Sequence, residues 1–582
     1  MKNEKLNHSC SHLLAAAVLE LWPDVLPTLG PAIENGFYYD FDFGNKKVSD
    51  DDLQIIEDKM HEISLTWTNF EREEIEPKKA QEIYKNNPYK LELVAEHSGE
   101  GETITIYKSG NFSDLCRGGH IDPSLIPIKY FKLLSLAGAY WRGSEKNRML
   151  TRIYGTCWSS QKELDSHLTM IEESKKRDHR TIGKDLNLFV FSDLVGKGLP
   201  LLTPKGATIR RELERFVVDE ELKRGYQHVL TPPLAKTDLY KTSGHYPYYK
   251  DTMYPVMKVD DEELILRPMT CPHHFMLYKS SLHSYKELPL RYAELSPQYR
   301  YEKSGELTGL MRVRMFTLAD AHIFATKEQA KQVISEVLDL IQDVNSIFGM
   351  TKGQDYRYRL SLGDRSDSKK FYKDDAAWEY AEDVLRNVLT ERAEPFFDGL
   401  GEAAFYGPKI DVQVKKANGH EETAFTVQYD FVMPTRFDLK FIDADGKESQ
   451  PIVIHRSSIG AFERTMAFLI EKFAGAFPTW LSPIQVKVLP ISEKHQQYAM
   501  EIVTKLRSAG IRTELDDRNE SLNSKIRDAQ MEKIPYMLIL GEKEMTAQTV
   551  MQRGRNGKQS GPFSLEEFIS NIKKEIDDKL IV

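Results

Sequence analysis

The sequence has 582 residues, of which 41% are hydrophobic and 29% charged, and its formal net charge is −9. A chain this long exceeds a single hydrophobic core, so we expect about three or four domains. It holds no apolar run of about eighteen residues and starts with the charged stretch MKNEKLNHSC, so neither a membrane span nor a secretion signal is predicted. The negative charge argues against indiscriminate coating of nucleic acid, although a local basic patch can still bind it.

The four cysteines lie far apart in the sequence, at Cys10, Cys116, Cys157 and Cys271. Scattered cysteines in a large chain do not make a disulfide framework. We therefore expect a cytoplasmic protein whose thiols are free or bound to metal.

The first part of the chain is predicted to be a self-contained α+β domain, residues 1–178. An apolar-periodic helix is predicted over residues 8–21 and is stopped by Pro23, and a strand is predicted over residues 36–42. The charged run 172–180 predicts a solvated helix that leads out of this domain.

The remaining chain divides into two further predicted domains. Over residues 179–482, helices alternate with strands whose separation suits an antiparallel sheet rather than regular βαβ units. Residues 483–582 change to a strand, helix, strand, helix, strand order with strands near 486–490, 512–516 and 536–541. That order is typical of a small α/β domain. The whole chain is thus predicted to be an α+β multidomain protein.

Three distant segments combine a potential zinc ligand with groups suited to a nucleotide. Cys271 lies in RPMTCP, His322 ends RVRMFTLADAH, and His455 begins HRSSIGAFER. Three nitrogen and sulfur ligands would leave the fourth tetrahedral position of a zinc ion open, which is how catalytic zinc is held. Packed core residues are the ordinary alternative, and spacings this long do not decide between the two.

Three motifs follow one another in the central part of the chain. The first is GYQHVLTP at 225–232, the second is RYAELSPQYRYEKSG at 291–305, and the third is the segment HRSSIGAFER. In this order they resemble the motifs of class II aminoacyl-tRNA synthetases, and the chain resembles threonyl-tRNA synthetases over nearly its whole length. The resemblance implies a class II catalytic core on an antiparallel sheet, an N-terminal α+β editing domain and a C-terminal α/β anticodon-binding domain.

The resemblance implies how ATP is handled. The carboxylate of an amino acid attacks the α-phosphorus, and catalysis rests on positioning and on neutralisation of charge by arginines and Mg²⁺. Arg300 is expected at the reacting carboxylate and α-phosphate, and Glu302 at the adenine. Arg312 and Arg464 are expected at the outer phosphates, although each arginine alone would be an ordinary surface residue. His245, in TSGH, matches a histidine that assists transfer to tRNA.

The resemblance also implies one Zn²⁺ per subunit, held by Cys271, His322 and His455. An open zinc position can bind the amino group and the hydroxyl of threonine together, so valine, which lacks the hydroxyl, is refused. Asp320 is expected to accept the hydroxyl proton. Further residues match family positions in the amino-acid and adenylate pocket, with Lys409 counted as catalytic: Met269, Tyr406, Lys409 and Gln428.

Serine keeps the hydroxyl and lacks one methyl group, which gives only about 1–3 kcal/mol of discrimination, so a second, hydrolytic site is expected. His8 and His12 are four residues apart and share a helix face. Cys116 and His120 repeat that spacing. With Asp114 they resemble the editing site of threonyl- and alanyl-tRNA synthetases. The quartet is also a possible ligand set for a second zinc, but we expect the metal-free form.

The resemblance assigns Asn519, Glu544 and Arg553 to reading the anticodon of tRNA(Thr), since amide, carboxylate and guanidinium groups can address the edges of unstacked bases. Taken singly, each would be a solvated surface residue. The motif at 225–232 forms the dimer interface in the family, so a homodimer is expected. An amphipathic helix leading into a strand explains that segment equally well.

The sequence departs from the family pattern at four positions. His273 stands where glycine is usual, and Gly119 replaces a proline. Leu318 and Thr423 stand where glutamine is common. We expect His273 not to bind the metal, and Gly119 to loosen the editing loop. We expect a form without the ubiquitin-like domain that usually opens bacterial relatives, either because the lineage lacks that domain or because this sequence was trimmed.

Two alternative functions are weighed against the threonine ligase with proofreading. One is a synthetase-like protein that keeps tRNA-binding or regulatory contacts without ligation. The other is a deacylase that hydrolyses mischarged tRNA through its N-terminal domain. The intact set of ATP-site and zinc-site residues favours the ligase.

Overall fold

The computed structural model describes residues 2–99 and 103–581. The chain forms two compact units, Met1–Glu172 and Glu173–Val582, called here the N-terminal unit and the C-terminal unit. The division falls inside helix α5 (Gln161–Lys176), within the charged run predicted as a linker. The predicted domain boundaries at residues 178 and 482 remain predictions. No helix in the described ranges combines the length and apolarity that crossing a membrane requires.

The N-terminal unit contains two antiparallel sheets. The larger follows the order β1-β3-β8-β7 with β2 paired to β3, and the smaller follows β4-β5-β6. The elements are α1 (Lys2–Leu21), β1 (Leu26–Pro27), β2 (Ala32–Ile33), β3 (Gly36–Asp42), α2 (Asp52–Ser64), β4 (Glu71–Glu74), α3 (Pro77–Ile83), α4 (Pro88–Gly99), β5 (Thr105–Ser109), β6 (Phe112–Leu115), β7 (Tyr130–Tyr140) and β8 (Met149–Trp158).

Helix α1 and strand β3 are the two elements predicted for this unit, and both are confirmed. The helix starts six residues earlier than predicted, at Lys2 rather than His8, and ends before Pro23 as expected. Its alanine- and leucine-rich second half favours helix formation. That half packs into the same buried core as Phe37 and Phe41 of β3. The core therefore holds α1, with His8 and His12, in a fixed position.

The C-terminal unit is built on one large sheet with the order β11-β15-β16-β23-β20-β19-β17-β18. All pairings are antiparallel except those of the two end strands, β11 with β15 and β17 with β18. This confirms the predicted antiparallel sheet. Its elements up to the C-terminal domain are α6 (His179–Asp185), β9 (Phe189–Val190), β10 (Leu201–Leu202), α7 (Pro204–Lys223), β11 (Gln227–His228), β12 (Leu234–Lys236), α8 (Thr237–Ser243), α9 (His245–Tyr248), β13 (Met257–Val259), β14 (Glu262–Leu266), α10 (Cys271–Lys279), β15 (Leu290–Tyr299), β16 (Met315–Ala325), α11 (Ala330–Ile347), β17 (Tyr356–Leu362), α12 (Asp375–Glu391), β18 (Phe396–Leu400), β19 (Lys409–Lys415), β20 (Glu421–Asp430), α13 (Met433–Arg436), β21 (Phe441–Ile442), β22 (Glu448–Ser449), β23 (Ile452–Ala461) and α14 (Phe462–Phe473).

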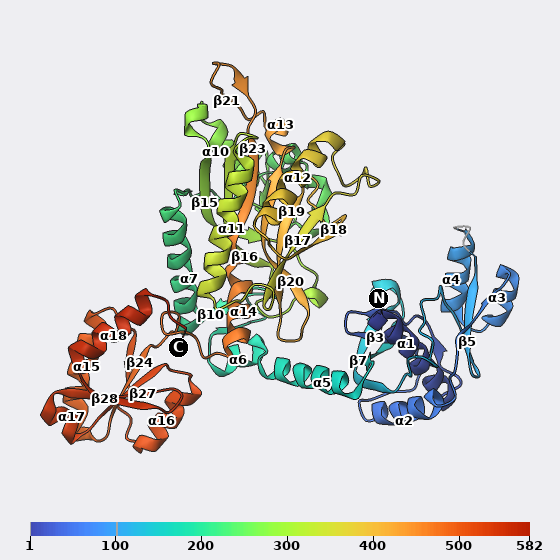
Figure 1. Cartoon of the computed structure of the whole chain (residues 1–582), viewed down its shortest axis with the longest axis horizontal. Coiled ribbons are helices and arrows are strands. Elements are labelled where there is room, and N and C mark those ends of the chain that lie inside the picture. Colours follow the sequence, from blue (N-terminus) through green and yellow to red (C-terminus); the bar gives the residue numbers. More distant parts are fainter. Residues whose placement is uncertain (1, 100–102, 582) are drawn as a thin grey trace. The chain divides into compact units, whose positions relative to one another are not determined.

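Helix α11 lies along this sheet (Figure 1) and shows why the fold forms. Its apolar residues recur every three or four positions, so they make one stripe along the helix. Val333, Val337 and Ile341 belong to that stripe and join the same buried core as Ile323 and Ile454 of the sheet. The other face of the sheet is thereby left for polar side chains.

The C-terminal domain, drawn in red in Figure 1, is a five-stranded mixed sheet with the order β25-β24-β26-β27-β28. Strands β24, β25 and β26 are parallel, as the predicted strand and helix alternation requires, and β27 and β28 add an antiparallel edge that was not predicted. The elements are β24 (Val486–Pro490), α15 (Gln496–Ser508), β25 (Thr513–Leu515), α16 (Leu522–Met531), β26 (Tyr536–Leu540), α17 (Glu542–Ala547), β27 (Thr549–Gly554), β28 (Gln559–Ser564) and α18 (Leu565–Asp577).

The charged run 172–180 is not one helix as predicted. Helix α5 ends at Lys176, and α6 starts at His179 after Asp178, whose side chain accepts a hydrogen bond from the Arg180 backbone nitrogen. His179 is buried: its Nδ1 lies 2.7 Å from Glu471, and its Nε2 accepts from the Leu310 backbone nitrogen at 3.1 Å. The start of α6 is therefore tied to the loop that follows the second motif.

A buried ion pair joins helix α7 to the centre of the sheet and gives a stability prediction. Arg456 Nη1 donates to Glu221 Oε1 at 2.6 Å, and its guanidinium lies 4.0 Å from the centre of the Tyr226 ring. Glu221→Gln leaves a buried guanidinium without its counter-charge, so we expect a loss of about 3–5 kcal/mol in the free energy of unfolding. Thermal and urea unfolding measure it. Asp238→Asn, in a surface pair, is the control, and equal stability of the two variants would contradict the prediction.

Candidate active site

The three predicted zinc ligands meet in one place. His322 on β16 and His455 on β23 are direct cross-strand partners, and Cys271 is the first residue of α10. The ligand atoms of all three lie within 4.8 Å of one another, and the side chains are buried. The two imidazole centroids are 4.6 Å apart. We call this group of one thiol and two imidazoles the candidate metal centre.

A carboxylate sets the proton of His455. Its Nε2 lies 2.8 Å from Asp430 Oδ2. Because a carboxylate accepts and does not donate, Nε2 carries the hydrogen, and Nδ1 keeps its lone pair. Burial lowers the pKa of His322 well below its usual value and raises the pKa of the Cys271 thiol. A metal bound here would have to displace the thiol proton.

The candidate metal centre opens into a cavity of about 310 Å³. The cavity is lined by strands β15, β16, β20 and β23 and by the loops beside them. The predicted site residues in its wall are Met269, Cys271, Arg300, Glu302, Arg312, Asp320, His322, Tyr406, Gln428, His455 and Arg464. The structure therefore brings together the candidate ligands, the three predicted arginines and every predicted pocket residue except Lys409.

Asp320 lies two residues before His322, so both side chains point to the same face of β16. Gln298 Nε2 donates to Asp320 Oδ2 at 3.5 Å. Burial raises the pKa of Asp320, and the nearby histidines only partly offset it. A carboxylate with a raised pKa suits the acceptance of a proton from a substrate hydroxyl.

The three predicted ATP-binding arginines also border this cavity. The Arg300 guanidinium lies 5.0 Å from the centre of the Phe316 ring. Arg464 donates to the carbonyl oxygens of Thr423 and Met311 at 3.0 and 3.2 Å. Arg312 is half-exposed and forms an ion pair with Glu302 at 2.7 Å. Glu302 and Arg312, predicted to hold different parts of ATP, are thus paired with each other, and a nucleotide would have to exchange that contact.

Two predicted catalytic residues are not part of the described cavity wall. Lys409 pairs in register with Gln428 on the next strand, and its Nζ lies 2.7 Å from Asp411 Oδ2. His245 is buried with its ring 6.3 Å from that of Tyr406. Burial, assisted by the charge of His455, lowers the pKa of His245 to about 3, so it is neutral.

The structure separates the two histidines that follow Cys271. The His273 ring lies 6.3 Å from the ring of Tyr240, and His273 is not in the candidate metal centre. His274 instead contacts a ligand, with its Nδ1 2.8 Å from His322 Nδ1. The sequence analysis missed His274. The signal was available, because a residue three positions after Cys271 shares its helix face, whereas a residue two positions after it does not.

The two positions where glutamine is common both border the cavity. Leu318 presents an apolar side chain there, and Thr423 accepts a hydrogen bond from Gln413 Nε2 at 2.7 Å. Tyr406 and Gln428 form a short hydrogen bond, and the Tyr406 ring stacks on His455 with a centroid separation of 5.0 Å. The pocket floor is therefore an ordered set of polar and aromatic groups.

The predicted editing residues also come together. His8, His12, Cys116 and His120 place ligand atoms within 4.8 Å of one another in the N-terminal unit. Cys116 Sγ lies 3.3 Å from His120 Nε2 and 3.6 Å from His8 Nε2. Except for His120, these residues line a cavity of about 440 Å³. We call the four the editing cluster.

Two further residues singled out from the sequence, Asp114 and Gly119, lie close to the editing cluster. Asp114 is buried, with one oxygen 2.6 Å from Lys90 Nζ and the other 2.5 Å from Tyr39 Oη. Its carboxylate is therefore fully used in supporting the cavity wall. Gly119 has φ +90°. Proline fixes φ near about −65°, so the loop follows a path that the family's proline could not take.

The three predicted anticodon residues lie in the C-terminal domain. Asn519 is exposed in the loop between β25 and α16. Arg553 is half-buried on β27. The Glu544 carboxylate accepts a hydrogen bond from the Gly541 backbone nitrogen at 2.9 Å and so caps its own helix, α17. Glu544 thus has a structural use beside the predicted one.

Models of known protein families match three parts of the chain. Residues 254–473 match the tRNA synthetase class II core domain (G, H, P, S and T), and residues 485–575 match an anticodon binding domain. Residues 104–154 match the threonyl and alanyl tRNA synthetase second additional domain. With the antiparallel sheet and the arginine-lined cavity, these matches define a class II aminoacyl-tRNA synthetase.

Similar sequences and solved structures show which kind of class II synthetase the chain resembles. Threonine–tRNA ligases of Streptococcus pneumoniae and Streptococcus gordonii are each 51% identical over 99% of this chain and 88% of their own length. A solved structure of the RNA binding domain of threonyl-tRNA synthetase from Cryptosporidium parvum Iowa II is 35% identical, with a TM-score of 0.65 over 68% of this chain and 98% of its own. A putative threonyl-tRNA synthetase from Aeropyrum pernix is 27% identical, with a TM-score of 0.62 over 69% of this chain and 97% of its own.

The chain belongs to the threonine–tRNA ligase family. It is an aminoacyl-tRNA synthetase with an editing domain and an anticodon-binding domain, as predicted. These matches favour the ligase over the regulatory protein and the deacylase weighed at first.

The editing cluster gives a pH prediction. Burial, and then the charges of His12 and His8, lower the pKa of His120 to about 2. In the unfolded chain its pKa returns to about 6.5, so only the unfolded state takes up this proton between pH 6.5 and 2. Stability is therefore complete above pH 6.5 and lost as the pH falls, by about 2 kcal/mol at pH 5 for this residue.

Hydrogen exchange of the N-terminal unit in the full chain, compared at pH 7 and pH 5, measures that loss. His120→Asn is expected to reduce the difference between the two pH values. His167→Asn, in the same unit but outside the editing cluster, is the control. An unchanged pH dependence in His120→Asn would contradict the prediction.

Proposed function

We propose that this protein activates threonine with ATP and Mg²⁺ and transfers it to tRNA(Thr), using the residues predicted from the sequence. One observation carries the proposal: the candidate metal centre and the arginines Arg300, Arg312 and Arg464 border the same cavity. A cavity bordered by both a candidate metal centre and guanidinium groups fits an amino acid joined to a nucleotide. Neither the candidate metal centre alone nor the arginines alone would indicate that both an amino acid and ATP bind here.

Activation needs charge neutralisation more than acid or base chemistry. Arg300 and Arg464 place permanently charged guanidinium groups where the attacking carboxylate and the phosphates carry negative charge. Arg312 leaves Glu302 to bind phosphate, and Glu302 is then free to accept from the amino group of adenine. The chain thus lowers the barrier by holding both reactants and offsetting their charge.

The residues of the candidate metal centre fit Zn²⁺. Cys271 offers a sulfur, and His455 presents Nδ1 because its Nε2 hydrogen is given to Asp430. With His322 as third ligand, one tetrahedral position stays open. A bound zinc ion would supply a Lewis-acid site for the amino group and hydroxyl of threonine. Asp320 accepts the hydroxyl proton, and valine, without a hydroxyl, leaves these groups unpaired.

Serine has the same hydroxyl as threonine, so the zinc site would accept it, and a second site is needed to remove serine from the tRNA. We assign the editing cluster to hydrolysis of Ser-tRNA(Thr), with His8 and His12 orienting a water molecule beside Cys116 and His120 holding the Cys116 side chain in place. Both nitrogens of His120 are already engaged, Nδ1 with Ser9 Oγ at 3.2 Å and Nε2 with Cys116 at 3.3 Å. These contacts support the metal-free form of the editing cluster that we propose, with one zinc per subunit as the expected content.

The protein is further proposed to act as a homodimer in the cytoplasm. Strand β11, in the first motif, is an end strand of the large sheet and can extend across a symmetric interface. Leu230 beside it is 89% exposed, and Leu222 on α7 is 53% exposed. The four free cysteines suit a reducing compartment.

Amino-acid-dependent ATP–pyrophosphate exchange on the zinc-loaded protein tests the ligase. We expect strong exchange with threonine, weaker exchange with serine, and exchange with valine reduced by about 10⁴-fold, because the open metal position goes unfilled. Cys271→Ser removes a ligand and is expected to lower bound zinc, and threonine exchange more than about 100-fold. Cys10→Ser, at another buried thiol, is the control. Absence of exchange with all three amino acids would overturn the ligase assignment.

Hydrolysis of Ser-tRNA(Thr) by the full-length protein tests the editing cluster. Cys116→Ala removes a group that contacts two of the three histidines, and we expect deacylation to fall about 100-fold while threonine exchange stays unchanged. Cys157→Ala, a buried thiol of the same unit outside the cluster, is the matched control. If both variants edit at the parental rate, the cluster has been assigned wrongly.

A further inference from the structure

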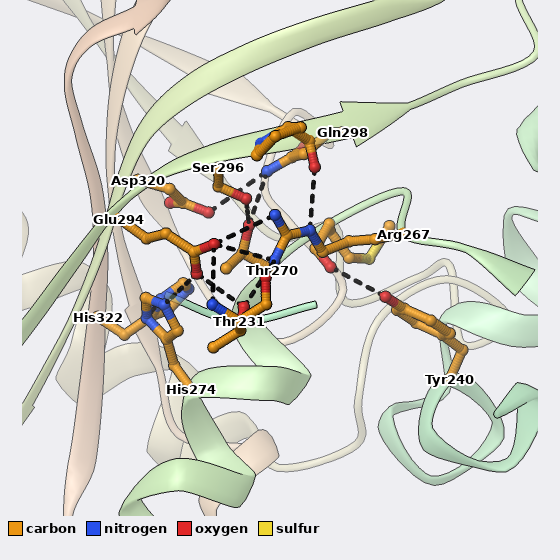
Figure 2. A network of polar contacts seen from close by, with 12 residues as sticks. Thr231, Tyr240, Arg267, Thr270, His274, Glu294, Ser296, Gln298, Asp320 and His322 are labelled. Carbon is orange, nitrogen blue, oxygen red and sulfur yellow. Dashed lines mark hydrogen bonds and ion pairs between the residues drawn. The ribbon is translucent and has the colours of Figure 1, made fainter. Parts of the chain in front are cut away.

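A row of buried polar side chains runs from His322 into the protein interior (Figure 2). His274, on α10, places its Nδ1 2.8 Å from His322 Nδ1. The two rings are almost perpendicular, at 88°, with centroids 4.7 Å apart. Both side chains are buried. A hydrogen bond between two buried imidazoles needs one donor and one acceptor, so the order of their protons is constrained.

The far end of this row is a carboxylate. His274 Nε2 lies 3.1 Å from Glu294 Oε2. Glu294 also receives the Thr231 hydroxyl at 2.7 Å and both terminal nitrogens of Arg267 at 3.2 Å. Arg267 and Glu294 are buried, and Figure 2 shows the Arg267 guanidinium beside the Glu294 carboxylate. The row is therefore anchored by an ion pair that cannot turn into solvent.

The carboxylate orders every proton along the row. Glu294 accepts and does not donate, so His274 Nε2 carries a hydrogen and gives it to Glu294. In neutral His274 the other nitrogen, Nδ1, then has a lone pair and accepts. His322 Nδ1 must therefore carry the hydrogen of the bond between them. What remains on His322 is Nε2 with its lone pair.

His455 also keeps one nitrogen with a free lone pair, but through a direct contact with a carboxylate. His455 gives its Nε2 hydrogen directly to Asp430, which frees its Nδ1. His322 has no carboxylate in contact among the described residues and reaches Glu294 only through His274. Each of the two candidate imidazole ligands is thus linked to a carboxylate: His455 directly to Asp430, and His322 to Glu294 through His274.

We propose that His274 is a positioning residue of the metal centre, which passes the constraint of the Glu294–Arg267 pair to His322 and so presents the lone pair of His322 Nε2 to a divalent metal. This inference rests on the zinc site proposed above. Partners of this kind fix the tautomer and ring orientation of metal-binding histidines, and their loss costs about 10–100-fold in metal affinity.

The ordinary alternative is that His274 only fills the core and satisfies its hydrogen bonds. That role would affect stability and leave metal affinity unchanged in the folded protein. Glutamine separates the two, because its amide oxygen can accept from His322 while its amide nitrogen donates to Glu294. Leucine keeps much of the volume and can do neither.

The experiment measures zinc affinity of the full-length protein by competition with a chelator, for the parent, His274→Leu, His274→Gln and His273→Leu. His273 is the matched control, a buried imidazole on the same helix that packs near Tyr240. Circular dichroism and thermal unfolding without metal establish that each variant is folded. The absorption spectrum of bound Co²⁺ reports ligand geometry independently of enzyme activity.

We expect His274→Leu to bind zinc about 10–100-fold more weakly and to change the Co²⁺ spectrum, with most of the affinity restored in His274→Gln and none lost in His273→Leu. Parental affinity in a folded His274→Leu would overturn the positioning role and leave the zinc site standing. Equal losses in the leucine and glutamine variants would also overturn it. A parent that binds no zinc would overturn the site and the inference together.

Discussion

The pairing of β16 with β23 is the constraint on which the active site depends. It sets His322 opposite His455, and the neighbouring pairings bring Gln428 opposite His455 and Asp320 opposite Glu294. Because side chains alternate between faces, a slip of one residue would turn each of these groups into the apolar core. The buried stripe of α11 opposes such a slip, since it packs against the other face of the same strands. Packing energy on one side of the sheet thus maintains chemical geometry on the other.

Much of the fold and of the candidate site could be predicted from the sequence, and the rest depends on contacts that no local pattern encodes. The antiparallel sheet was predicted from the spacing of the strands, which is a local feature, and the candidate ligands Cys271, His322 and His455 were predicted from the family resemblance of the motifs around them. The ion pair between Arg312 and Glu302 was not predicted, since it requires two loops to meet. The role of His274 was hidden for another reason. Its neighbour His273 is the residue that departs from the family pattern, and only helix periodicity distinguishes them.

The two histidine and cysteine groups of this protein are ordered by different means. In the candidate metal centre, the ordering group is a carboxylate: Asp430 contacts His455 directly, and Glu294 acts on His322 through His274. In the editing cluster, the ordering group is a hydroxyl: Ser9 donates its hydrogen to the Lys5 carbonyl oxygen at 2.9 Å, so toward His120 Nδ1, 3.2 Å away, it is the acceptor.

The division of the chain inside α5 has a kinetic meaning. The cavity that would form the aminoacyl bond lies in residues 173–582, and the cluster that would break it lies in residues 1–172. A single acceptor end cannot occupy both at once, so it must leave the first before it enters the second. The accuracy of aminoacylation then depends on two competing rates: the release of the charged tRNA into solution, and the binding of its acceptor end by the N-terminal unit. The length and stiffness of α5 would set the effective concentration of the editing cluster near the bound tRNA, a quantity that neither site determines by itself.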